Sequence, residues 1–154
     1  MSLHKFFAEQ FLPYSLERVF GFFKKPENLN QVTPKNLGFK ILTPSPILMA
    51  KGTEIDYTIR LYGIPMRWKT IITEYDPPHF FTDAQVKGPY QVWIHTHRFV
   101  AQNGGTLMID DLQYTIPLGW LGELARAMFV KKEIERIFEY RKKVIKQIFE
   151  EGVD

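Results

Sequence analysis

Two histidines separated by one residue, His95 and His97, are the side chains in this sequence best suited to acid–base chemistry. In an extended strand alternate residues point to the same face of a sheet, so both imidazoles share a face with Trp93 and Phe99. A carboxylate beside an imidazole holds the ring in one tautomer and lets it act as a general acid or base. If the two aromatic neighbours face the interior, the histidines do as well.

Two flanking segments can bring carboxylates to this face. The preceding segment supplies Phe81, Asp83 and Gln85, and the following one supplies Met108, Asp110, Leu112 and Tyr114. Buried polar groups cost a few kcal/mol unless they are partnered, so this set indicates a hydrogen-bond network, a ligand, or both. One interpretation is a closed network that ties strands together. The other is a ligand site in which His95, His97 and Asp110 are the candidate catalytic residues.

Arg141 lies near the middle of an apolar helical face that runs from residue 134 to residue 148. A guanidinium directed at a sheet needs an anion, for which Asp110, Asp83 and a ligand carboxylate are candidates. In the alternative interpretation, the long stem covers apolar surface and the charged head reaches the rim of a cavity.

The spacing of His95 and His97 also occurs in metal sites, although a chain with no cysteine can offer a metal only histidine and carboxylate ligands. Histidines whose hydrogen bonds are satisfied within the protein account for the same spacing. We therefore predict no metal and no cofactor.

Aromatic residues make up 15% of the chain, an unusual amount of ring surface to bury or use. Tyr57, Trp68, Tyr90 and Tyr114 could line a pocket for a flat or acyl-like ligand, and ordinary sheet core is the alternative for each of them. The residues predicted to bind a ligand are Tyr57, Trp68, Phe81, Asp83, Gln85, Trp93, His95, His97, Asp110, Tyr114 and Arg141.

The elements that must position these residues begin with a predicted strand, HKFFAEQFLP, before a helix, SLERVFGFFKK, that Ser15 can cap. Pro26 can open a second short helix, which ends at Pro34. From Gly38 the apolar period changes to two, with Gly and Pro at short intervals, as in an antiparallel meander. The residues Asn103, Gly104 and Gly105 give the strongest hairpin signal, and six to seven strands are expected.

After Pro117 and Gly119 the chain is predicted to be helical to about Glu150. Its apolar residues point in two directions, which predicts either a bend near Val130 or burial of different faces against different elements. An apolar helix face of this length needs a sheet to cover it. The predicted fold class is therefore α+β of the helix-grip kind, with a curved antiparallel sheet around a long C-terminal helix and two short helices after the first strand.

Length and charge limit the remaining possibilities. A chain of 154 residues predicts a single domain over residues 1–154. The net charge of +3 comes from interspersed signs, so nucleic acid is not an expected partner. No run approaches about 18 apolar residues, and the N-terminal segment MSLHKFFAEQF lacks the apolar core of a signal peptide. We expect a cytoplasmic protein without stable membrane insertion.

The chain resembles the START-like superfamily, also called SRPBCC, which includes pollen allergens, polyketide cyclases and lipid-transfer proteins. The similar segments are the early helix pair, YGIPMRW, DPPHFFTDAQVKGPYQVWIHTHRF, GGTLMIDDLQYTIPLG and IFEYRKK. The resemblance implies a helix-grip fold with a cavity between sheet and helix, but it brings no shared catalytic motif.

The favoured function is non-enzymatic binding or carriage of a small, largely apolar or amphipathic ligand, such as a lipid, isoprenoid, polyketide or aromatic compound, by a monomer or homodimer. The alternative is a cyclase or dehydratase that uses His95, His97 and Asp110 as acid and base, with Arg141 orienting an anionic group. An interaction module that acts through the sheet edge or the amphipathic helix is a third class, which a large exposed apolar patch would support.

Overall fold

Seven antiparallel strands form a single sheet in the computed structural model, which describes residues 2–152, in the order β1-β7-β6-β5-β4-β3-β2. The strands are β1 His4–Leu12, β2 Lys40–Ile41, β3 Glu54–Leu61, β4 Ile64–Asp76, β5 Phe80–Lys87, β6 Val92–Gln102 and β7 Gly105–Thr115. The helices are α1 Leu16–Phe23, η1 Pro26–Asn28, α2 Leu29–Val32, η2 Lys35–Leu37, α3 Gly119–Ala125, η3 Arg126–Val130 and α4 Lys131–Glu150. The predicted helix-grip fold is confirmed. The strand that the sequence pattern missed, β2, is only two residues long and therefore shows no period.

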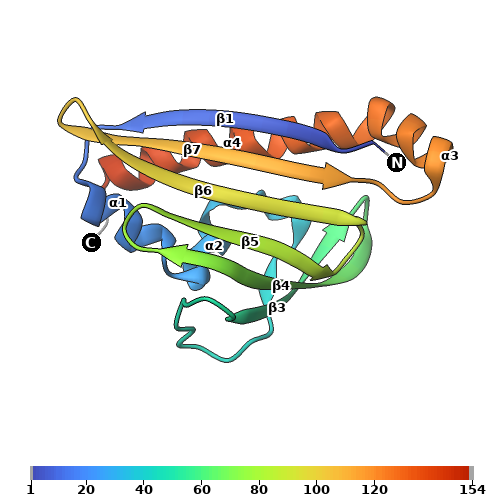
Figure 1. Ribbon diagram of the computed structural model, residues 1–154, viewed down its shortest axis with the longest axis horizontal. Coiled ribbons are helices and arrows are strands. Elements are labelled where there is room, and N and C mark those ends of the chain that lie inside the picture. The colour runs from blue at the N-terminus through green and yellow to red at the C-terminus, as the bar shows by residue number, and fades with distance from the viewer. Residues whose placement is uncertain (1, 153–154) are drawn as a thin grey trace.

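The helices lie on one side of the sheet, where α4 runs behind β1 and β7 and α1 and α2 lie behind the region of β5 (Figure 1). Helix α3 projects beyond the end of β7 (Figure 1). Local chemistry explains where α1 begins, because the Ser15 hydroxyl accepts a hydrogen bond from the Arg18 backbone N–H. The tight turn between β6 and β7 places Asn103 and Gly104 at positive φ, as the sequence predicted for this hairpin.

The packed end of the interior lies under α1. Phe20 packs edge-to-face on Phe99, with ring centroids 5.2 Å apart, and Phe22 does the same on Phe149 at 5.6 Å. These rings belong to one buried cluster that also includes Val19, Met108 and Ile145. Residues from α1, β6, β7 and α4 are thereby joined around a common aromatic core.

A π-helical turn, η3, explains why the apolar residues of the C-terminal helix point in two directions. The extra residue in such a turn rotates everything that follows relative to what precedes it. Ile134 and Ile145, after the turn, are buried. Of the two alternatives that the sequence left open, the burial of different faces is wrong, because Leu121, Leu124 and Met128 are each more than half exposed.

Candidate functional site

The register of β5, β6 and β7 brings the predicted polar residues together at the middle of the sheet. Asp83 pairs with His95, and His97 pairs with Asp110. The exposed fractions are 6% for His95, 7% for His97 and 9% for Asp110, so these side chains face inward, as the period of two predicts.

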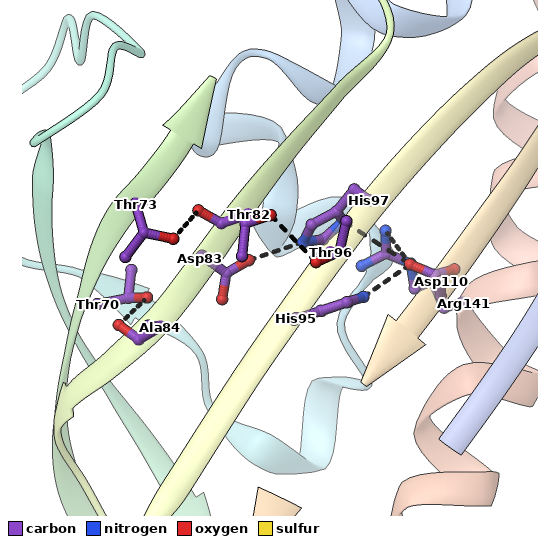
Figure 2. A network of polar contacts seen from close by, with 10 residues as sticks. All are labelled: Thr70, Thr73, Thr82, Asp83, Ala84, His95, Thr96, His97, Asp110 and Arg141. Carbon is purple, nitrogen blue, oxygen red and sulfur yellow. Dashed lines mark hydrogen bonds and ion pairs between the residues drawn. The ribbon is translucent and has the colours of Figure 1, made fainter. Parts of the chain in front are cut away.

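Each imidazole forms a hydrogen bond with a carboxylate, as Figure 2 shows. The distance from His97 Nε2 to Asp83 Oδ2 is 2.7 Å, and that from His95 Nε2 to Asp110 Oδ1 is 2.8 Å. The two imidazole rings stack on each other with centroids 3.7 Å apart, and His97 also stacks on Phe81 at 4.3 Å. The cluster therefore has a defined arrangement within the sheet.

Arg141 reaches the cluster from α4 and is only 7% exposed. Its Nη2 atom lies 3.7 Å from Asp110 Oδ1, close enough for an ion pair but too far for a hydrogen bond. The guanidinium carbon lies 5.5 Å from the ring centroid of Phe23 and 5.9 Å from that of Phe138. Among residues 2–152, no atom accepts a hydrogen bond from Arg141 Nε.

The pKa values of the cluster follow from burial and neighbouring charge. Burial opposes ionisation of Asp110, but the charge of Arg141 and the hydrogen bond from His95 outweigh it and lower the pKa of Asp110 well below its usual range. Burial also opposes ionisation of Asp83, yet the hydrogen bond from His97 and its charge lower the net pKa. Burial, together with the neighbouring His95, lowers the pKa of His97 to about 4.

These values assign the proton on His97. An ionised Asp83 only accepts hydrogen bonds, so Nε2 of the neutral imidazole carries the hydrogen and donates it. Nδ1 is then an unprotonated acceptor. It is buried, lies 3.7 Å from the nearest oxygen of Asp110, and has no hydrogen-bond partner in the described chain.

Two adjoining cavities border this cluster. The smaller one, which we call the α1-side cavity, has a volume of about 80 Å³. Its walls are largely apolar and come from α1, α2 and strands β2 to β6, with Arg141 from α4. The apolar lining residues are Phe22, Phe23, Pro26, Leu29, Val32, Phe39, Ile41, Met49, Ile55, Ile72 and Phe81.

The α4-side cavity has a volume of about 160 Å³ and lies between the sheet and the start of α4. Its ring and aliphatic walls are Leu29, Val32, Leu37, Phe39, Tyr57, Ile59, Leu61, Trp68, Tyr90, Trp93, Ile134, Ile137 and Phe138. Both cavities share Asp83, His97 and Arg141 from the polar cluster, and Tyr57. The polar cluster therefore lies where the two cavities meet.

Most of the predicted ligand-binding residues line these cavities. Tyr57, Asp83, His97 and Arg141 line both cavities, Phe81 lines the α1-side cavity, and Trp68, Trp93 and His95 line the α4-side cavity.

Three predicted residues lie elsewhere. The side-chain amide of Gln85 is bonded to the backbone of Tyr90. Tyr114 is buried in a core cluster with Leu112 and Ile134. Asp110 is in the cluster but lines an outer groove between β1 and α4.

Several lining residues were missed from the sequence because they lie on short helices and loops without a long period. Leu29 and Val32 on α2, Phe39 before β2 and Met49 in the following loop all line a cavity. The one usable signal was the resemblance to helix-grip proteins, in which a cavity lies between sheet and helices. It indicated the location without naming residues.

A metal ion could in principle use Asp83, His95 and His97, because one ligand atom of each lies within 4.8 Å of the others. Each imidazole Nε2, however, already binds a carboxylate, and the positive charge of Arg141 lies on the same cluster. The observed hydrogen bonds hold these side chains in place without an ion.

Residues 12–139 match the family described as polyketide cyclase/dehydrase and lipid transport, and the chain belongs to this family. Each of these activities requires a small molecule to be bound, so membership supports ligand binding in general. None of the curated protein sequences is significantly similar to this chain.

Solved structures show the same fold at low sequence identity. TTHA0849 from Thermus thermophilus is 19% identical, with a TM-score of 0.77, covering 97% of this chain and 100% of that one. Ms6760 from Mycobacterium smegmatis is 13% identical, with a TM-score of 0.71 and coverage of 97% and 92%. The major latex-like protein 151 of Panax ginseng is 12% identical, with a TM-score of 0.67 and coverage of 94% and 96%. In the described part of this chain, no helix is long and apolar enough to cross a membrane.

Proposed function

We propose that this protein binds or carries a small, largely apolar ligand in the two adjoining cavities between the sheet and its helices. The observation that carries the proposal is the meeting of two apolar cavities at the polar side chains of Asp83, His97 and Arg141. Lipids, isoprenoids, polyketides and aromatic compounds all fit this description.

Such a lining gives affinity and orientation by different means. Apolar walls contribute about 25 cal/mol for each Å² of apolar surface removed from water. A few polar groups fix how the ligand lies, as in most small-molecule sites. The moderate volumes, about 80 and 160 Å³, favour a ligand of medium size over a large lipid with two long chains.

A second function, acid–base catalysis of a cyclase or dehydratase type, is favoured by one observation. His97 has an unprotonated, unpartnered Nδ1 beside the cavities, and Asp83 holds its Nε2–H. This is how a carboxylate prepares an imidazole to remove a proton. His95 and Asp110 would form the neighbouring pair, and Arg141 would hold an anionic group.

Native mass spectrometry of the purified protein, followed by extraction of bound compounds, tests the binding function. We expect a retained or readily added apolar small molecule. Leu29→Trp fills the shared wall of both cavities and should abolish the adduct. The control is Leu48→Trp, which adds the same ring at a residue that is 85% exposed. If neither added nor co-purified apolar compounds bind the wild-type protein, the proposed function is wrong.

A cytoplasmic location, a monomeric or homodimeric state, the single domain and the absence of nucleic-acid binding remain predictions from the sequence.

A further inference from the structure

Arg141 is only 7% exposed, and its buried Nε donor has no acceptor among the described residues. Arginine has five N–H donors, and here its contacts are two aromatic rings and one carboxylate oxygen at 3.7 Å. A buried charge of this kind is costly unless an acceptor pairs with it. Arg141 lines both cavities as well as the outer groove between β1 and α4, and a ligand in either cavity can supply that acceptor.

His97 offers the complementary group. Its Nδ1 can accept a hydrogen bond, is buried without a partner among the described residues, and lies 3.7 Å from the same oxygen of Asp110 that Arg141 approaches. A single ligand group that accepts a hydrogen bond from Arg141 and donates one to His97 would satisfy both side chains.

The charge of the cluster limits which group this can be. Asp83 and Asp110 carry two negative charges, and Arg141 is the one permanent positive charge beside them in the described residues. Tyr57, which packs beside them from β3, has its pKa raised well above the usual range by burial and by Asp83, so it adds no charge. A bare carboxylate would add a third negative charge to this buried site, whereas a carboxyl group that keeps its proton would add none.

We infer that the ligand of this site is an apolar carboxylic acid, which accepts from the Arg141 guanidinium and shares its proton with His97 Nδ1. The inference rests on the proposed binding function and names its ligand class. The atoms balance, because the carboxyl proton either stays on the ligand oxygen and donates to Nδ1 or moves onto Nδ1. In both forms the complex holds one proton that the separated neutral protein and carboxylate do not.

Proton uptake distinguishes this ligand class from other apolar compounds without any mutation. The groups that face His97 are Asp83 on β5, His95 on the same strand, Asp110 on β7 and Arg141 on α4. A free carboxylic acid ionises near the Glu value of about 4.3 and His97 near pH 4, so above pH 6 both are unprotonated before binding. Affinity for the acid should fall about tenfold for each unit of pH increase.

The experiment is isothermal titration calorimetry of the full chain with decanoic acid and, as a neutral ligand, decanol, between pH 6 and pH 8. Buffers with different ionisation enthalpies report proton uptake, which should be close to one proton per decanoic acid and none per decanol. His97→Gln should weaken the binding of decanoic acid, and Arg141→Met should weaken it at least tenfold and weaken that of decanol less. Lys142→Met, at the next and exposed position on α4, is the matched control.

The outcomes separate the two claims. The ligand class is wrong, and the binding function stands, if decanol binds and decanoic acid binds no more tightly. In that case decanoic acid would also bind without proton uptake, and Arg141→Met would not change its affinity. If neither compound binds, the binding function itself fails, and the inference fails with it.

Discussion

The inner face of β6 has a packed apolar end and a polar centre. At the packed end Phe99 is 2% exposed and contacts rings from α1 and from β5. Two and four residues earlier, His97 and His95 are also buried, yet they bind carboxylates and border cavities. Burial alone therefore does not distinguish core from site. The difference lies in whether each buried group has all of its partners within the chain.

The largest effect on stability should come from removing a buried ring at the packed end. We expect Phe99→Ala to lower the free energy of unfolding by about 3–5 kcal/mol, because it leaves a cavity among rings that cannot collapse onto it. Urea unfolding followed by fluorescence measures this change. The affinity of the protein that remains folded should be unaltered, and a lost affinity with unchanged stability would contradict the division between the two regions.

The second-largest effect should come from lowering the pH, which destabilises the folded protein through the polar centre of β6. His97 has a folded pKa of about 4, below its unfolded value of about 6.5, so the unfolded chain binds protons first as the pH falls. The contribution of His97 to the free energy of unfolding is fully present above pH 6.5 and should fall by roughly 3 kcal/mol as the pH is lowered to 4. The lowered pKa values of Asp83 and Asp110 add losses at lower pH, with the same sign.

Unfolding curves at several pH values measure this dependence. His97→Gln should remove most of the fall in the free energy of unfolding between pH 6.5 and pH 4, whereas His79→Gln, at an exposed histidine, should not. Equal acid sensitivity in the two variants would show that His97 is not the group responsible.

A smaller loss is expected from Asp110→Asn. The amide oxygen can still accept from His95, but Arg141 loses its only counter-charge within ion-pair distance among the described residues. We expect a loss of about 2 kcal/mol in the free energy of unfolding. Asp111→Asn, the adjacent position on β7, is the control. A stabilised Asp110→Asn protein would mean that Arg141 pairs elsewhere.

The smallest effect should come from the exposed apolar segment at α3. Trp120 is 74% exposed, so Trp120→Ser should change the free energy of unfolding by less than about 0.5 kcal/mol. Thermal unfolding checks this. A large loss would show that α3 is packed in solution, for instance against another copy of the chain.

The sequence predicted much of this arrangement because a period of two determines which side chains face inward. Spacing alone placed His95 and His97 on one face of their strand and placed Asp110 with the apolar residues of the next strand. The partners could not be assigned, since the pairing of His97 with Asp83 and of His95 with Asp110 depends on strand register and side-chain rotamers. Gln85 shows the limit, because its amide binds the local Tyr90 backbone instead of the cavity.

The start of the C-terminal helix shows a second limit. The change of apolar face was visible in the sequence, but the π turn that causes it has no compositional signature. Whether Leu121, Leu124 and Met128 would be covered depended on tertiary contacts, and the structure leaves them exposed.

The most direct test of the central claim is a ¹H–¹⁵N spectrum of the histidine side chains at pH 7, before and after addition of decanoic acid. The account predicts that His97 is neutral and protonated at Nε2 in the free protein, and that the acid shifts its Nδ1 resonance strongly while that of His79 stays in place. A His97 that is cationic in the free protein, or an Nδ1 resonance that does not move when the acid binds, would contradict it.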